Sequence, residues 1–179
     1  FLSKSLRESY LIPFLNQLFT HDTQQERRFL TRFSLKTMAD AGSRQREIPC
    51  GRMRVLLVED NPVNRTLTRR LLEKLGCEVM TANDGQAASS LWQWHQFDVV
   101  FMDCVMPRMD GYEATRQLRA WETNHGRSRV PVVALTASAM EEDEERCREA
   151  GMDSFVAKPV NLEMLRAVLE QYCQASATS

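Results

Sequence analysis

Four apolar, strand-like segments of this sequence are each followed by polar side chains that could take part in chemistry. Glu59 and Asp60 follow the first of these segments, Asp103 follows another, and Thr136 and Lys158 follow the two nearest the C-terminus. Three carboxylates at one place raise each other's pKa values unless a cation lies among them. Hard oxygen ligands with room for water suit Mg²⁺, and an ammonium and a hydroxyl group would complete a pocket for a phosphoryl group. These residue types therefore predict a magnesium and phosphoryl site, provided that the fold brings them together.

The segments that must position these residues alternate between strand-like and helix-like patterns. Short apolar runs predict five strands, at residues 55–58, 77–82, 98–102, 130–135 and 154–157. Apolar residues at helical spacing predict helices near residues 62–75, 86–93, 112–122, 139–150 and 162–172. Five β/α units with short connections predict an α/β fold with a five-stranded parallel sheet and helices on both faces. In such sheets functional groups gather beyond the carboxyl ends of the strands, which is where the polar residues lie.

The first predicted helix carries the clearest boundary signals. Asn61 is typical of an N-cap and Pro62 of the first helical position, and Gly76 is typical of a stop. Four apolar residues recur at every fourth position between these signals: Val63, Leu67, Leu71 and Leu75. This spacing predicts one apolar face of the helix.

Four segments that contain the polar residues resemble bacterial response-regulator receiver domains. They are VLLVEDNPVN (55–64), VVFMDCVMPRMDGYEA (99–114), VVALTAS (132–138) and FVAKPV (155–160). Each segment alone is only suggestive, but all four occur in the right order and each lies at a strand end. The resemblance covers residues 53–173 and implies a flavodoxin-like doubly wound (βα)5 fold. The style of the first two segments most resembles the receivers attached to hybrid sensor histidine kinases.

The resemblance implies a role for each residue of the predicted site. Asp103 would be the phosphoacceptor, and Lys158 would contact the phosphoryl oxygens. Asp60 and Asp103 would bind Mg²⁺ (or Mn²⁺) directly, and Glu59 would act through a metal-bound water. The backbone carbonyl of Val105 would be a further metal ligand.

The resemblance also implies a switch formed by Thr136 and Phe155. Thr136 would turn inward to hydrogen-bond the phosphoryl group, and Phe155 would rotate inward with it. Phe155 stands where the family commonly has tyrosine, so the aromatic ring is kept and the hydroxyl is absent.

The function expected from these residues is Mg²⁺-dependent transfer of a phosphoryl group from a phosphohistidine to Asp103, in a two-component phosphorelay. An ionised aspartate can attack phosphorus, and the transfer depends mostly on positioning and charge neutralisation. The expected partners are the phosphohistidine domain of a histidine kinase and a histidine phosphotransfer domain, with a weak dimer as a further expectation. The chain contains no ATP-binding glycine-rich box, so the kinase activity would belong to a longer parent, a hybrid sensor histidine kinase.

Two other functions stay open. One is a stand-alone response regulator whose output is binding to another protein. The other is an α/β aspartyl-phosphate phosphatase, although such enzymes carry a second acid two residues after the nucleophile, where this chain has Val105. A degenerate, purely structural receiver is disfavoured because every required site residue is present.

Composition and charge indicate which partners and which cellular location to expect. The net charge of −1 gives no sign of a nucleic-acid partner, and no apolar run approaches the roughly 20 residues that span a bilayer. Five cysteines without a CxxC motif disfavour zinc and dithiol redox chemistry and fit a reducing compartment. The expected location is the cytoplasm, with the parent anchored in the inner membrane and no membrane contact by this fragment.

Charge and composition also divide the chain near residue 52. Residues 1–52 hold 9 Lys and Arg against 5 Asp and Glu, whereas residues 53–179 hold 14 against 19. This change of sign predicts a linker at 21–52, the receiver domain at 53–175 and a short tail at 176–179.

Residues 1–20 allow two interpretations. Phe1–Leu6 resembles Phe155–Val160, with the same spacing from the aromatic residue to the lysine, and an amphipathic stretch follows in both places. The segment is therefore either the last strand and helix of a preceding receiver-like domain or a generic interdomain helix.

Overall fold

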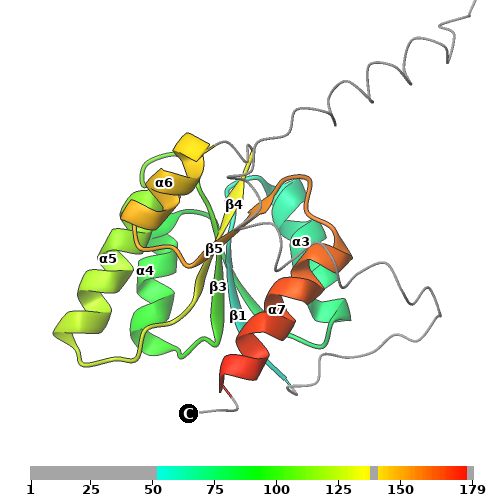
Figure 1. Cartoon of the computed structure of the whole chain (residues 1–179), viewed down its shortest axis with the longest axis horizontal. Helices are drawn as coiled ribbons and strands as arrows, with labels where there is room; N and C mark the ends of the chain where they lie inside the picture. The colour runs from blue at the N-terminus through cyan, green and yellow to red at the C-terminus, as the bar shows by residue number, and fades with distance from the viewer. Residues whose placement is uncertain (1–51, 138–140, 177–179) are drawn as a thin grey trace, which may run out of the picture. The chain divides into compact units, whose positions relative to one another are not determined.

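The computed structural model describes residues 52–137 and 141–176 (Figure 1). The predictions for residues 1–20 and for nearly all of the linker at 21–52 lie outside these ranges. No helix in the described ranges is long and apolar enough to cross a membrane. The last helix ends at Ser176, one residue beyond the predicted end of the receiver domain.

Five parallel strands form one sheet in the order β2-β1-β3-β4-β5. The strands are β1 (Arg54–Val58), β2 (Glu78–Ala82), β3 (Val99–Asp103), β4 (Val132–Thr136) and β5 (Ser154–Ala157). Every residue of β3 and β4 is buried, as expected of parallel strands covered on both faces. Because β1 pairs with both β2 and β3, the direction of winding reverses between β1 and β3, which places a topological switch point there.

Helices cover both faces of this sheet (Figure 1). α4 (Gly85–Trp94), α5 (Gly111–Asn124) and α6 (Glu141–Glu149) lie on one face, and α3 (Pro62–Lys74) and α7 (Leu162–Ser176) lie on the other. Neighbouring residues of a strand point to opposite faces, so Met102 packs in the cluster beneath α4 to α6 and Phe101 in the cluster beneath α3 and α7. The predicted α/β fold with a five-stranded parallel sheet is confirmed.

Short polar residues fix where three of the helices begin. The Asn61 side chain accepts hydrogen bonds from the backbone N–H groups of Val63 and Asn64, at 2.9 and 3.3 Å. Asp84 and Asp110 cap α4 and α5 in the same way, with N···O distances of 2.7 and 2.8 Å. These bonds satisfy N–H groups that have no partner inside the helix.

The predicted apolar face of α3 is only partly buried. Leu72 and Leu75 are fully buried, but the side chains of Val63 and Leu67 are 72% and 54% exposed. A residue at every fourth position advances by about 40° around a helix with 3.6 residues per turn, so the stripe rotates off the sheet toward its N-terminal end. Thr68 is buried there instead.

Two predicted strand boundaries also shift. β3 begins at Val99 and includes Asp103, so the carboxylate belongs to the strand rather than to the following loop. β4 begins at Val132 instead of residue 130. Pro131 has no N–H to give to a neighbouring strand, and the N–H of Val130 donates to the side chain of Glu122 at 2.7 Å. The other elements lie within a few residues of their predicted bounds.

Candidate functional site

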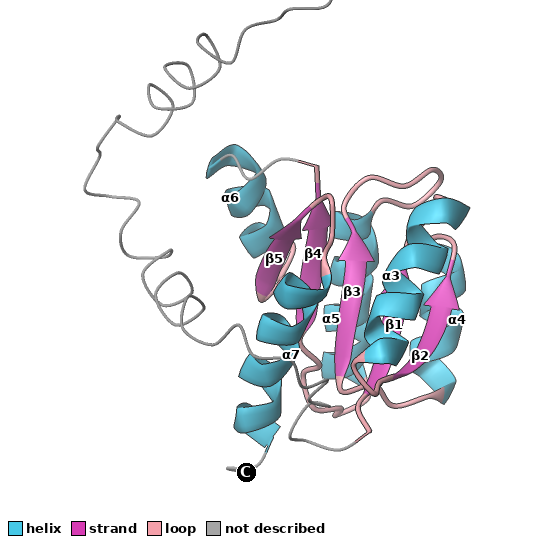
Figure 2. Cartoon of the chain, turned by 90° about the vertical axis from the view of Figure 1, so that its right-hand side faces the viewer, coloured by secondary structure: helices cyan, strands magenta, loops and turns pink. Residues whose placement is uncertain are grey.

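The carboxyl ends of the strands meet at one edge of the sheet, where the strand arrows point in Figure 2. Glu59 and Asp60 directly follow β1, Asp103 is the last residue of β3, and Thr136 is the last residue of β4. Lys158 directly follows β5. The fold therefore carries all five predicted polar residues to the same edge.

Three carboxylates converge at this edge. Glu59, Asp60 and Asp103 each offer an oxygen, and these oxygens lie within 4.8 Å of one another. Glu59 is 1% exposed and Asp103 is 4% exposed. Burial raises the pKa of Asp103, and the neighbouring charge of Glu59 raises it further, so that the pKa lies above its ordinary value despite an opposing hydrogen bond from Lys158.

Lys158 joins two of these carboxylates. Its Nζ lies 2.8 Å from Asp103 Oδ2 and 2.7 Å from Glu59 Oε2. Burial lowers the pKa of Lys158, but its contacts with the two carboxylates outweigh burial and leave the pKa above its ordinary value. The site thus has one ammonium beside three carboxyl groups, and the negative charge is in excess.

The carboxylate cluster fits a divalent cation. Carboxylate oxygens are hard ligands, which suit Mg²⁺. Glu59 Oε2 is buried, and it has the ion pair with Lys158 but no hydrogen bond of acceptable geometry. Such an oxygen could accept a hydrogen bond from a metal-bound water. We conclude that the cluster could hold a cation, which would offset its excess negative charge.

The first turn of α3 supports the loop that carries Glu59 and Asp60. Arg65 donates from one guanidinium nitrogen to the backbone carbonyls of Glu59 and Asp60, at 2.7 and 3.0 Å. Asn64 donates from its side chain to Glu59 Oε1 at 3.2 Å. Neither Asn64 nor Arg65 was predicted as a site residue. The signal in the sequence was their place in the first turn of a helix that starts immediately after the acidic pair.

Gly111 allows the chain to pass close behind Asp103. A Cβ built on Gly111 would collide with the carbonyl oxygen of Asp103, whose carbonyl carbon would be 2.9 Å away. The N–H of Gly111 donates to the carbonyl of Cys104 at 3.1 Å. The start of α5 therefore packs directly on the backbone that carries the Asp103 carboxylate.

The remaining predicted residues lie around the cluster at different depths. The N–H of Val105 donates to Asp103 Oδ1 at 3.3 Å, while the Val105 side chain is 75% exposed. Thr136 is buried, and its carbonyl accepts a hydrogen bond from the N–H of Lys158 at 2.7 Å. Phe155 on β5 pairs with Ala134, which precedes Thr136 by two positions on β4. The Phe155 side chain is partly buried and packs on the cluster beneath α4 to α6. Phe155 and Thr136 thus share one face of the sheet, because residues two apart in a strand point the same way.

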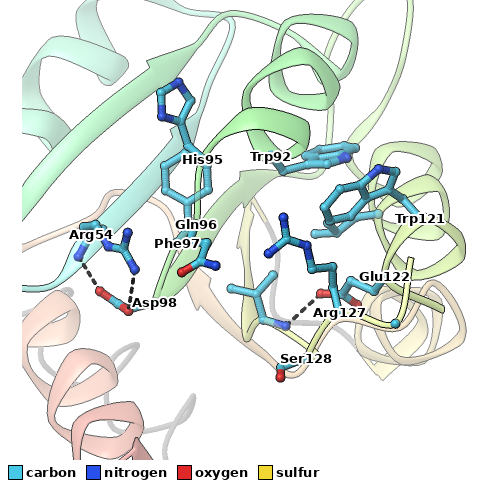
Figure 3. Close-up of a pocket in the computed structure, with 13 residues that line it drawn as sticks. Arg54, Trp92, His95, Gln96, Phe97, Asp98, Trp121, Glu122, Arg127 and Ser128 are labelled. Atoms are coloured by element: carbon cyan, nitrogen blue, oxygen red, sulfur yellow. Dashed lines mark hydrogen bonds and ion pairs between the residues drawn. The ribbon is translucent and has the colours of Figure 1, made fainter. Parts of the chain in front are cut away.

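A cavity of about 400 Å³ lies at the opposite, amino-terminal end of the strands (Figure 3). Its walls include Arg54 at the start of β1, the side chains of Trp92 and Trp121, and Arg127, which lies over the Trp121 ring. None of the residues that line it belongs to the predicted site. This cavity is therefore separate from the acidic cluster.

Known proteins resemble this chain over the same residues. The sequence profile of the response regulator receiver domain family matches residues 55–170. The virulence sensor protein BvgS of Bordetella bronchiseptica is 42% identical over 127 residues, which are 70% of this chain and 10% of that protein. The chain thus spans about a tenth of the length of this curated relative.

Two solved structures are similar to the described fold. One is the receiver domain of the sensor histidine kinase PA1611 from Pseudomonas aeruginosa, with magnesium coordinated in its active site cleft. It is 41% identical with a TM-score of 0.62, over 68% of this chain and 98% of that one. The other is the receiver domain of the Saccharomyces cerevisiae response regulator Ssk1 in complex with the histidine phosphotransfer protein Ypd1, at 30% identity and a TM-score of 0.68, over 71% and 92% of the two chains. With the family profile matching residues 55–170, this chain belongs to the response regulator receiver domain family.

Proposed function

We propose that this domain accepts a phosphoryl group on Asp103 from a phosphohistidine, as one step of a phosphorelay. The observation that carries the proposal is the placement of Asp103 between two further carboxylates and the Lys158 ammonium. The carboxylate is the nucleophile, the ammonium is the charge partner, and the acidic pair is the metal-binding side of one small site.

The chemistry follows from the positions of these groups. One Asp103 oxygen attacks phosphorus, a new O–P bond forms, the P–N bond to the donor imidazole breaks, and the imidazole leaves. Mg²⁺ bound by Asp60, Asp103 and, through water, Glu59 would neutralise charge on the phosphoryl oxygens. Lys158 is already 2.8 Å from Asp103 Oδ2, so it needs little movement to contact a phosphoryl oxygen there. The Thr136 hydroxyl would be a further donor, and the Val105 carbonyl a further metal ligand.

The raised pKa of Asp103 bears on this role. Without a cation, burial and the Glu59 charge disfavour the ionised carboxylate that must attack. A bound divalent cation favours the ionised form because opposite charges attract. We therefore expect Mg²⁺ to favour phosphoryl acceptance by Asp103.

The partner surface that we propose includes the exposed apolar side chains beside the site. Val63, Leu67 and Val105 are 54–75% exposed, and all three follow β1 or β3 at the edge that carries Asp103. Single exposed apolar residues are common, but these three lie on the segments that directly follow β1 and β3, whose ends carry the site that a histidine side chain from another domain must reach. In the similar complex, the Ssk1 receiver binds the histidine phosphotransfer protein Ypd1. We infer that a histidine phosphotransfer domain contacts Val63 and Leu67 on α3, and that the longer parent of this domain is a hybrid sensor histidine kinase.

The phosphoacceptor can be tested by intact-mass measurement with Mg²⁺ and acetyl phosphate. We expect the chain to gain one phosphoryl group of about 80 Da, labile to hydroxylamine as an acyl phosphate is. Asp103→Asn should gain none. Asp110→Asn is the matched control, because Asp110 lies in the same loop but caps α5, and asparagine is an equally good cap. A phosphate that persists in Asp103→Asn would overturn the assignment.

The partner surface can be tested separately by calorimetric titration with a purified histidine phosphotransfer protein. Leu67→Ser should weaken binding by about tenfold, a loss of about 1.4 kcal/mol that matches removal of one moderate interface contact. Trp94→Ser is the control, since Trp94 is 83% exposed at the far end of α4. Equal affinities for both variants would contradict the proposed surface.

A further inference from the structure

Two buried thiols face each other next to the phosphoacceptor. Cys104 directly follows Asp103 at the end of β3, and Cys147 lies on α6. Their sulfur atoms are 4.0 Å apart, and the two residues are 2% and 5% exposed. Both are free thiols in the structure. They are 43 positions apart in the sequence, so only the fold brings them together.

Cys147 is the point at which α6 is anchored. Of the α6 side chains that the structure describes, residues 143–149, Cys147 alone is buried. The others are charged and are exposed or only partly buried, so the helix has little apolar surface to hold it to the sheet. A helix anchored by so small an apolar contact opens locally more readily than the core does. Such opening gives a small oxidant access to a thiol that is buried on average.

The surroundings of the pair favour reaction at Cys147. A hydrogen bond from the Cys104 thiol lowers the pKa of Cys147, and this effect outweighs the opposing effect of burial. The Arg146 guanidinium, which lies 4.6 Å from the centre of the Tyr112 ring, lowers this pKa further. Cys77 differs in both respects: it lies on the other face of the sheet, and burial raises its pKa to about 11.

We propose that Cys104 and Cys147 form a modification site, at which hydrogen peroxide oxidises the two thiols to a disulfide that ties α6 to the residue after Asp103. The Cys147 thiolate attacks one peroxide oxygen, an S–O bond forms, the O–O bond breaks, and the departing oxygen leaves as water after protonation. The Cys104 sulfur then attacks Cys147, an S–S bond forms, and the S–O bond breaks with release of a second water. Two thiols lose two electrons, and one molecule of hydrogen peroxide is reduced.

The geometry makes the second step short. The sulfur atoms must approach by about 2 Å to reach the length of a disulfide bond. Cys104 is held in the sheet by the hydrogen bond that its N–H donates to the carbonyl of Leu135, at 3.1 Å. Cys147 lies on α6, which has little apolar surface against the sheet and can therefore shift more easily. We therefore expect α6 to move toward β3 when the bond forms.

The test is oxidation of the full chain by hydrogen peroxide, followed by unfolding, alkylation of free thiols and peptide mapping. Cys50→Ser and Cys173→Ser are introduced together, which leaves Cys77, Cys104 and Cys147 as the three thiols. We expect a mass loss of about 2 Da for the two hydrogens removed, a cross-link between the peptides that carry Cys104 and Cys147, and full alkylation of Cys77. The same mapping on the unsubstituted chain should give the same cross-link. Cys147→Ala should abolish it.

Several results would overturn the proposal. All three thiols could stay fully alkylatable, or Cys147 could gain oxygen without forming a cross-link. A cross-link that forms only after denaturation would also overturn the proposal, as would a cross-link of Cys77 that forms as fast as the one between Cys104 and Cys147. In the oxidised chain, hydrogen exchange across α6 should slow, and an unchanged rate would contradict the tie. The proposal is separable from the phosphoacceptor role. If the chain forms the disulfide with peroxide but takes up no phosphoryl group while it is reduced, the phosphoacceptor role is overturned and this inference is left intact.

Discussion

Lys158 Nζ lies 2.8 Å from Asp103 Oδ2, so the lysine that follows β5 is the charge partner of the aspartate that ends β3. The same ammonium is 2.7 Å from Glu59 Oε2 at the end of β1. One cation thus joins the ends of three strands. Without a metal, this contact limits the repulsion among the buried carboxylates, and with a phosphoryl group on Asp103 it would neutralise part of the added charge.

The first prediction concerns the pH dependence of stability. The pKa of Asp103 is raised above its ordinary value of 3.8 in the folded chain. Between pH 3.8 and the pKa of the folded state, the folded chain therefore binds more protons than the unfolded chain. The free energy of unfolding should therefore fall as the pH rises through this window. Asp103→Asn removes this dependence, so the variant should gain stability relative to the parent as the pH rises from acid toward neutral.

This prediction is checked by urea unfolding in EDTA at several pH values between the two limits. Asp110→Asn serves as the control, because Asp110 caps α5 outside the cluster. Identical pH slopes for the parent and Asp103→Asn would show that the pKa of Asp103 is not raised. Lys158 contributes in a different range. Its pKa is raised above 10.5, so its stabilisation is complete below that pH and is lost only as the pH rises through the folded value.

The second prediction concerns Mg²⁺. A cation that binds only the folded state stabilises it by about 2.7 kcal/mol at a hundred times its dissociation constant. Asp60→Asn removes a charged oxygen from the cluster and should lower Mg²⁺ affinity at least about tenfold, which removes about 1.4 kcal/mol of that stabilisation. Asp98→Asn is the control, because Asp98 pairs with Arg54 at the opposite end of the sheet. Unfolding curves with and without Mg²⁺ measure the effect, and equal responses of the two variants would argue against the metal site.

The third prediction concerns Arg65, which donates to the carbonyls of Glu59 and Asp60. Arg65→Met should leave these carbonyls without their charged donor and cost about 1–2 kcal/mol of stability. Mg²⁺ affinity should fall by about tenfold because the loop that presents Asp60 loses its support.

Arg69→Met is the matched control on the same helix. Arg69 makes an exposed ion pair with Glu73 at 2.7 Å, and both side chains are more than 40% exposed. Exposed pairs of this kind contribute roughly 0.3–0.5 kcal/mol, so this variant should change stability little and Mg²⁺ binding not at all. If the two variants behave alike, Arg65 does not support the site.

The fourth prediction concerns Gly111. Alanine there would bring a Cβ into the carbonyl of Asp103, and backbone cannot yield as a flexible side chain can. Gly111→Ala should cost about 1–3 kcal/mol through overpacking and should also slow phosphoryl uptake, because Asp103 would be displaced. Gly126→Ala is the comparison, since its Cβ would meet nothing within 4 Å, although its φ of +59° makes alanine mildly strained. A smaller stability loss for Gly111→Ala than for Gly126→Ala would contradict the close approach.

Local signals in the sequence sufficed for most elements of the fold. Asn61 and Pro62 marked the start of α3, and Asp84 and Asp110 stand as caps of α4 and α5 because each bonds to an N–H only three positions away. The short apolar runs that became β1, β3 and β4 are buried on both faces. Interactions between residues close in sequence act in any fold that forms these elements, so they can be recognised without the tertiary structure.

Burial on α3 was less predictable. Val63 and Leu67 have the same residue types and spacing as buried helix residues, yet they are exposed. Whether an apolar residue is covered depends on where the helix axis lies on the sheet, and this is set by packing along the whole interface rather than by the helix sequence.

The sequence by itself determined the chemical types at the site and the strand ends that carry them. Asp60, Asp103 and Lys158 follow or end their strands, and parallel strands place all such positions at one edge. Only the tertiary structure decided how these groups meet: the contacts of Lys158 with Asp103 and Glu59, the support of the loop by Arg65, and the approach of Cys104 to Cys147. Distances between side chains on different strands and helices result from the packing of the entire core, because each element's position is fixed by all of its neighbours at once.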